Sequence, residues 1–292
     1  MKKIFLLLIF LTFFCKVNGQ VFSEKDNSLV WELTSKDSKK PSYIVFTTAG
    51  TCESNVGLLT KISHLLDKIK IYYTETGIGN PKNEKESQKY AFLSNADESV
   101  KKLLPDSVYL QLKSQVSGLV LPDNLDKLSP VMINGIVAKT ITPKCNISNN
   151  TEAIFINYAV KYKFEIRELL NVQEAFKILN SYGNAYYAAQ INYMLQNKET
   201  VAADITKKAG LYVNEDMKGL QELYATSHFL NARYNLSELE KERTGLILSR
   251  INEAAKTGGA LITLDLASVM SGKFNLFSEL KNMGYDLRAV ND

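Results

Sequence analysis

The first third of the chain has the pattern of apolar and polar residues that is typical of an α/β unit. Leu29–Leu33 and Tyr43–Thr47 are short apolar runs on either side of a polar turn, and they predict a β-hairpin. Leu58–Lys68 carries apolar residues at helical spacing, and Ile69–Thr74 is rich in β-forming residues. The order strand, helix, strand predicts a parallel crossover.

The middle of the chain is mostly helical by its hydrophobic period. Val131–Thr142 predicts an apolar helix in the core, and Lys163–Leu169 predicts a strand between helices. Asn214–Asp216 has the residue types that cap a helix, so a helix is expected over Met217–Tyr224. Glu238–Ala255 predicts another long helix.

The end of the chain returns to an α/β pattern. Ala260–Leu266 predicts a buried strand, Phe274–Met283 a helix that Gly284 caps, and Asp286–Val290 a final strand. Because strands at both ends surround a helical middle, the sequence predicts an α/β fold with a mixed central sheet. That sheet is built from N- and C-terminal segments, with a large helical insertion between them.

The N-terminus predicts export. Met1–Lys3 is basic, Ile4–Phe14 is apolar but too short to span a membrane, and Val17–Gly19 has small residues, so residues 1–19 are interpreted as a secretory signal peptide. Two bulky phenylalanines precede Cys15, which disfavours lipid attachment there. We therefore expect a periplasmic or extracellular protein.

The mature chain, residues 20–292, is interpreted as a single domain without an integral membrane span. Loss of residues 1–19 removes three lysines and no acids, which lowers the formal net charge from +4 to +1. The remaining Lys-Lys pairs are scattered, so the sequence lacks the clustered basic residues of a nucleic-acid-binding protein. Two cysteines remain, Cys52 and Cys145, and an even pair in an oxidising compartment predicts a disulfide.

Several segments of the mature chain carry a family resemblance by their order and spacing. They are Asn27–Leu33, Lys39–Ile44, Leu103–Asp106, Leu128–Pro130, Gly272–Lys273, Leu276–Lys281 and Met283–Tyr285. Together they resemble the TraB/GumN (TraB/PrgY/GumN) family over essentially the whole mature chain. The resemblance implies metal-dependent hydrolysis, which includes proteolysis in animal members.

The family's marks are two Gly-x-x-His motifs, an early glutamate after a strand and an arginine in a late helix. Neutral imidazoles bind divalent transition metals, and a carboxylate completes the shell or acts as a base. Two motifs at opposite ends of a chain meet at one site if their strands are neighbours.

This sequence departs from the family at both motifs. The first falls on Phe46–Ala49, so Phe46 replaces the glycine and Ala49 the histidine; in the second, Leu266 and Val269 stand at those positions. A middle acid of the family falls on Leu169–Asn171 and is also missing. The resemblance therefore assigns no metal ligand set here.

Two residues of the family pattern remain, Glu75 and Arg243, as remnants of a catalytic site. Each has a plainer interpretation: Glu75 as a polar residue at a strand end, and Arg243 as an exposed charge on a helix.

A rearranged metal shell is the alternative. His64 and His228 are the only histidines, and Asp265 lies near the end of the predicted strand Ala260–Leu266, where it could join Glu75 and Cys52 around a metal. A single histidine is more often a surface residue than a ligand, whereas an all-oxygen site for a hard cation stays open.

Other features of the sequence point to packing. Tyr182, Tyr186, Tyr187 and Tyr193 lie at near-helical spacing, which favours an amphipathic helix over a binding face for a peptide or glycan. The mature chain has no nucleophile elbow, phosphate loop or His-Glu-x-x-His motif.

The leading hypothesis is therefore an exported, degenerate relative of metal-dependent hydrolases. It is not an enzyme, needs no cofactor, and has a binding or regulatory role toward a protein, peptide or glycan. The alternatives are an active hydrolase that uses a divalent metal in a rearranged shell and a structural envelope protein.

Overall fold

A computed structural model describes residues 22–37, 40–49, 56–93, 95–143, 151–232, 237–270 and 276–291. The predicted signal peptide with Cys15 lies outside the described residues, and so do Cys52 and Cys145 of the predicted disulfide. Of the helices described, none combines the length and the apolar character that a membrane crossing requires.

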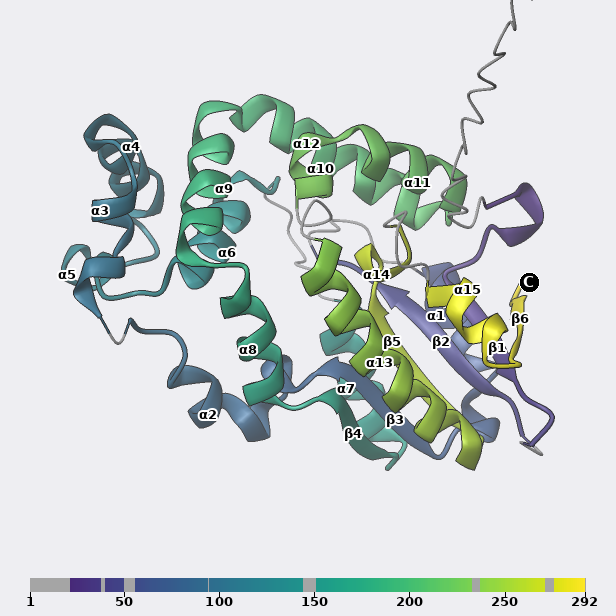
Figure 1. The fold of residues 1–292 in the computed structure, drawn as a ribbon. Helices are drawn as coiled ribbons and strands as arrows, with labels where there is room; N and C mark the ends of the chain where they lie inside the picture. Colours follow the sequence, from purple (N-terminus) through teal and green to yellow (C-terminus); the bar gives the residue numbers. More distant parts are fainter. Residues whose placement is uncertain are drawn as a thin grey trace, which may run out of the picture.

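The centre of the molecule is a six-stranded mixed sheet in the order β4-β3-β5-β2-β1-β6 (Figure 1). The strands are β1 (Val30–Thr34), β2 (Ser42–Thr47), β3 (Ile71–Thr76), β4 (Glu165–Leu170), β5 (Ala260–Asp265) and β6 (Asp286–Ala289). β1 pairs antiparallel with β2 and with β6, while β2, β5, β3 and β4 are parallel. The predicted α/β class, the hairpin and the origin of the sheet in both ends of the chain are confirmed.

The predicted parallel crossover between β2 and β3 is also confirmed, but the two strands are not neighbours. β5, from the far end of the chain, lies between them and pairs with both. The backbone passes close to Lys68 at Gly259, directly before β5. Gly259 has φ of 70°, and a Cβ added there would lie 2.9 Å from the carbonyl oxygen of Lys68. Only glycine fits this left-handed, crowded position without strain.

The helices follow the predicted order, with ends shifted by a few residues. They are α1 (Val56–Ser63), α2 (Glu84–Gln88), α3 (Val100–Leu103), α4 (Asp106–Val116), α5 (Pro122–Leu125), α6 (Pro130–Ile141), α7 (Thr151–Lys161), α8 (Val172–Ser181), α9 (Asn184–Gln196), α10 (Lys198–Val213), α11 (Met217–Thr226), α12 (His228–Asn231), α13 (Ser237–Thr257), α14 (Ala267–Met270) and α15 (Leu276–Asn282). The prediction for Leu58–Lys68 was too long. The Ser63 hydroxyl bonds back to the Thr60 carbonyl, and α1 ends there.

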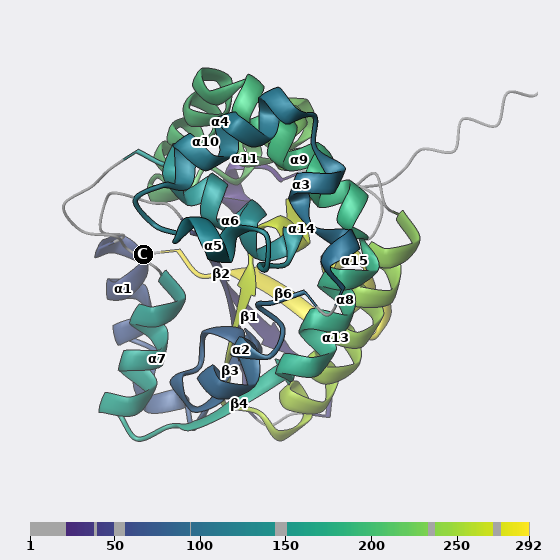
Figure 2. The same cartoon turned by 90° about the vertical axis from the view of Figure 1, so that its left-hand side faces the viewer.

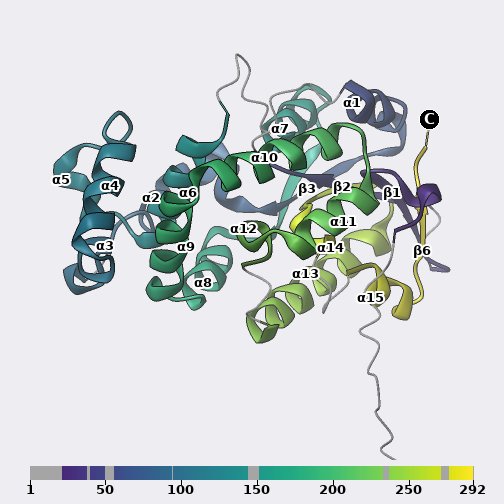
Figure 3. The ribbon, with the colours of Figure 1, turned by 90° about the horizontal axis from the view of Figure 1, so that it is seen from above.

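The helices form layers around the sheet. Seen from above, α1 and α7 cover one face of the sheet, and α13 and α15 cover the other (Figure 3). α10, α11 and α12 cross above the sheet (Figure 1), and α3 to α6 with α9 form a helical unit at one side, which faces the viewer in Figure 2. This arrangement leaves the ends of the parallel strands surrounded by helices.

The main core surrounds the central strands, and an aromatic group anchors it. Trp31 and Phe46 pack on Phe277 with ring centroids 4.5 and 5.5 Å apart. Every residue of β2 is buried, as expected for a strand covered on both faces. A second cluster, which includes Leu112, Val137 and Ile191, forms the core of the helical unit.

A buried ion pair joins the sheet to the helices above it. Glu215, between α10 and α11, lies 2.9 Å from the Lys61 ammonium through Oε1 and accepts the Leu29 N–H at 2.8 Å through Oε2. Glu215 has φ of 52°, so the chain turns sharply there before Asp216 caps α11, as the sequence predicts.

We expect Lys61→Met to lower the free energy of unfolding by about 3–5 kcal/mol, because it leaves the Glu215 carboxylate buried without its cation. Urea denaturation measures this loss. Lys102→Met, which removes the cation of the exposed pair with Asp97, is the matched control and should leave stability unchanged. Equal losses in the two variants would contradict the assigned role of the buried pair.

Candidate functional site

The four parallel strands end at one edge of the sheet, where α/β proteins commonly bind ligands. β2 ends at Thr47, β5 at Asp265, β3 at Thr76 and β4 at Leu170. α10 reaches this edge, since the Tyr212 hydroxyl donates to the Phe46 carbonyl at 2.8 Å. The edge therefore combines groups from both ends and the middle of the chain.

The two degenerate motif segments meet at this edge, as predicted for neighbouring strands. Thr47 pairs with Asp265 in the register of β2 and β5, and the Leu266 N–H donates to the Thr47 carbonyl at 2.8 Å. Phe46 and Leu266, at the glycine positions, lie in the core. Of the histidine positions, Ala49 is exposed and Val269 is buried, and neither side chain has a metal-donor atom.

Glu75 and Arg243 form a buried ion pair at the carboxyl end of β3. Arg243 reaches it from α13, and its Nη2 donates to Oε1 of Glu75. The other carboxylate oxygen, Oε2, accepts the Asp265 N–H at 2.6 Å. The interpretation of Arg243 as an exposed helix charge is wrong, because both residues of the pair are only 7% exposed.

Further polar residues contact the Arg243 guanidinium on α13 and α14. Nη2 of Arg243 also donates to the Ser268 hydroxyl at 3.1 Å, and Nη1 lies 3.6 Å from the Glu240 carboxylate. The Tyr182 hydroxyl donates a hydrogen bond to the Glu240 carboxylate. Sequence reasoning missed Glu240 and Ser268, although Glu240 precedes Arg243 by one helical turn, a spacing that places both on one face.

The tyrosines near α9 serve packing, the interpretation that the sequence favours. Tyr182 and Tyr187 are buried, and the Tyr187 hydroxyl donates to the Leu179 carbonyl at 2.8 Å. The hydroxyl of Tyr182 is the exception, since it reaches the site through Glu240.

Two cavities, each of about 200 Å³, flank Glu75 and share Glu75, Thr76 and Asp265 as lining residues. We call them together the edge cleft. The polar cavity is also lined by Thr47, Thr48, Ala49 and Glu152. The apolar cavity is also lined by Ile78, Leu170, Ala175, Ile178, Leu179, Tyr182 and Arg243.

One further ionisable group, Glu152, lines the polar cavity, and another, Lys208, contacts the backbone of a lining residue; sequence reasoning missed both. Glu152, on the first turn of α7, accepts a hydrogen bond from the Thr74 hydroxyl. Desolvation raises the pKa of Glu152, and the nearby charges of Glu75 and Asp265 raise it further, against the effect of Thr74. Lys208 of α10 donates to the Ala49 carbonyl at 3.1 Å. Burial lowers the pKa of Lys208, and the nearby charge of Asp265 partly opposes this shift.

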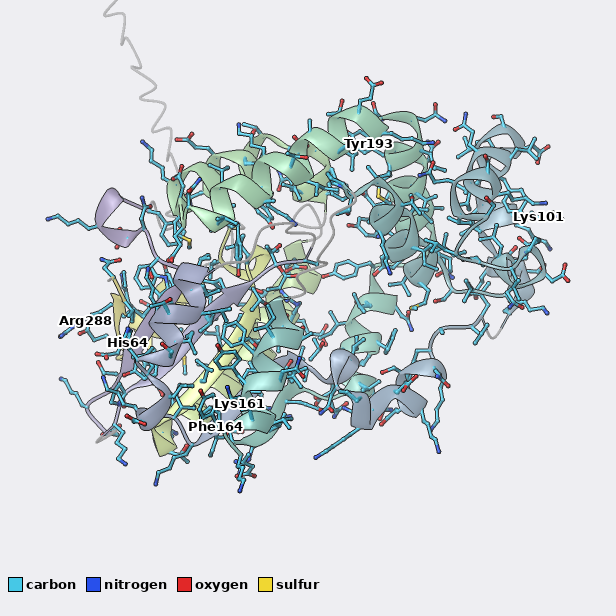
Figure 4. All side chains as sticks on the ribbon, turned by 180° about the vertical axis from the view of Figure 1, so that it is seen from behind. His64, Lys101, Lys161, Phe164, Tyr193 and Arg288 are labelled. Atoms are coloured by element: carbon cyan, nitrogen blue, oxygen red, sulfur yellow. The ribbon has the colours of Figure 1, made fainter. Side chains whose placement is uncertain are left out.

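Neither histidine joins this site. His64 lies exposed on the turn after α1, and His228 stacks on Tyr193 with ring centroids 4.3 Å apart. Figure 4 shows His64 and Tyr193 in well-separated parts of the molecule. In the described ranges, no three His, Cys, Asp or Glu side chains are placed to hold a metal ion.

The residues present do not fit the metal that the family resemblance implies. The two positions expected to carry imidazoles have aliphatic side chains. Both oxygens of Glu75 accept hydrogen bonds from within the protein. A divalent transition metal needs several convergent donors, and this set of residues does not supply them.

A family model described as the TraB/PrgY/gumN family matches residues 29–289, nearly the whole chain. No curated protein and no solved structure matches the chain significantly.

We expect Glu152→Gln to stabilise the protein at neutral pH. The folded-state pKa of Glu152 is raised, so its ionisation opposes folding, and this cost reaches its full size above the folded-state pKa. Below the ordinary glutamate pKa, the residue is protonated in both states and the cost is absent. Glutamine keeps an acceptor for the Thr74 hydroxyl.

Melting temperatures measured across this pH range test the prediction. Glu222→Gln makes the same charge change on an exposed residue of α11 and is the control. A gain for Glu152→Gln that stays constant from acid to neutral pH would contradict the assigned burial effect.

Proposed function

The chain belongs to the TraB/PrgY/gumN family, and we propose that it is an exported, non-hydrolytic member that uses the edge cleft to bind a ligand in a regulatory role. The proposal takes account of two facts: the chain has the family fold, and aliphatic side chains stand where the metal ligands of a hydrolase are expected.

The proposal rests on the observation that both carboxylate oxygens of Glu75 are already bound within the protein. A hydrolase of this kind needs a carboxylate that binds the metal or takes a proton from water. In this chain the Arg243 guanidinium holds one oxygen of Glu75, and the main-chain N–H of Asp265 holds the other. Catalysis by Glu75 would have to break a buried charge pair, and no imidazole is present at position 49 or 269 to bind a metal in exchange.

The cleft itself supports a binding role over a purely structural one. Its two cavities lie at the ends of the parallel strands, the usual ligand position of this class of fold. Polar groups from β2, β3, β5 and α7 converge on the polar cavity. A small number of placed polar groups beside an apolar wall is typical of small-molecule sites.

Export is the second part of the proposal, and the N-terminal sequence supports it. A basic start, a short apolar run and a small-residue exit are the three parts of a secretory signal. In an oxidising compartment the two mature cysteines are expected to pair. The partner, which is a protein, a peptide, a glycan or a smaller molecule, then meets the protein outside the cytoplasm.

Metal retention tests the non-hydrolytic assignment. Residues 20–292, incubated with Zn²⁺, Mn²⁺ or Co²⁺ and desalted, should retain far less than a stoichiometric amount of metal, because the site lacks convergent donors. Elemental analysis gives the ratio, and Glu75→Ala is the matched variant, which should match the wild type. Near-stoichiometric retention that Glu75→Ala abolishes would overturn the proposal in favour of a hydrolase.

Mass spectrometry tests export and the disulfide together. Protein recovered from the envelope or medium of a secreting host should begin at Gln20, since the signal is expected to be cleaved after Gly19. Without reductant, thiol alkylation should add no mass; after reduction it should label both Cys52 and Cys145. Retention of residues 1–19, or labelling before reduction, would contradict the corresponding part.

A further inference from the structure

We propose that the edge cleft takes a small primary amine with an apolar body. Its ammonium lies in the polar cavity beside Asp265 and Glu152, and its apolar part lies in the neighbouring cavity against Leu170 and Ile178. This inference rests on the proposed binding function and names the chemical class of the ligand.

The balance of charge around the cleft favours a cation. Among the described residues, three acids line it, namely Glu75, Glu152 and Asp265, whereas Arg243 is the cation that lines it and Lys208 lies next to it at the Ala49 carbonyl. The guanidinium of Arg243 is already engaged by Glu75 and Glu240. A carboxylate or phosphate ligand would therefore meet more acids than cations, whereas an ammonium would be attracted.

Asp265 gives the ammonium its point of contact. It ends β5 and lines both cavities, and it is exposed while the other residues of the strand are buried. Oδ1 accepts the Ala267 N–H at 2.8 Å, which fixes the orientation of the carboxylate. In the part of the chain that the structure describes, no cation forms an ion pair with Asp265.

The hydroxyl groups at the polar cavity suit an ammonium as well. Thr47 and Thr48 line it together with Thr76, and a hydroxyl oxygen accepts hydrogen bonds from an N–H donor. An ammonium has three donors and no fixed coordination geometry, so one or two carboxylates with hydroxyl oxygens satisfy it. A divalent cation requires six or more oxygen ligands or a strict octahedron, which is a much stronger demand on placement.

The apolar cavity accounts for the body of the ligand. Leu170 lies in the segment where the family resemblance expects an acid, and it forms part of an aliphatic wall with Ile178 and Leu179. Transfer of the ligand's apolar surface from water into this cavity has a favourable free energy. A polar body of the same size would lose hydrogen bonds to water without replacement along this wall.

Calorimetric titration of residues 20–292 with isoamylamine and with isovalerate tests the proposal, because the two probes share one branched apolar body and differ in the sign of their charge. We expect isoamylamine to bind and isovalerate not to bind. Asp265→Asn, nearly isosteric, should weaken amine binding about tenfold by removing a charge-assisted hydrogen bond. Asp97→Asn, the same change at an exposed residue just before α3, should leave it unchanged.

Leucine-glycine amide, a dipeptide with the same ammonium and side chain, separates two sources of the amine. Tighter binding of this dipeptide than of isoamylamine supports the proposal and assigns the ligand to a peptide amino terminus; the reverse order supports a free amine. Equal binding of isovalerate, no binding of any amine, or equal weakening by Asp97→Asn and Asp265→Asn would overturn the proposal. Since metal retention is measured separately, absence of both metal and amine binding would overturn the amine assignment alone.

Discussion

The structure of the site depends on the buried ion pair between Glu75 and Arg243. Two opposite charges removed from water are stable only when their remaining hydrogen-bonding groups are also satisfied. Here the Asp265 N–H donates to the second carboxylate oxygen of Glu75. The Arg243 guanidinium donates to the Ser268 hydroxyl and lies close to the Glu240 carboxylate. The pair thereby ties the end of β3 to β5, α13 and α14, so the geometry of the cleft follows from the requirement to satisfy these two charges.

The same pair explains why the site does not fit the chemistry of a metal-dependent hydrolase. A bound divalent cation is the largest local charge in such a site and reorganises the acids around it. In this chain the Arg243 guanidinium supplies a fixed positive charge, and it binds Glu75 from inside the protein. Asp265 and Glu152 line the polar cavity, and their carboxylates are the basis of the proposed affinity of the cleft for an ammonium.

The sequence predicted the elements of the fold well, because burial controls the hydrophobic period of strands such as β5 and of helices such as α6. It did not predict that β5 lies between β2 and β3, since strand order depends on long-range pairing that no local pattern records. The burial of Arg243 was missed for a similar reason. Tertiary contacts bury its charge on α13, whose sequence around it is polar and resembles an exposed helix.

The presence of Glu75 and Arg243 is not in itself evidence for catalysis. Removal of Arg243 would leave the Glu75 carboxylate buried without this cation, which typically costs about 3–5 kcal/mol, so Arg243 stabilises Glu75 whatever the function. The two motif positions are under no such mutual constraint: Ala49 is exposed, and Val269 is absorbed into the hydrophobic core. The pair therefore indicates how the edge of the sheet is held together. The charge and shape of the cleft beside it carry the argument for what the protein binds.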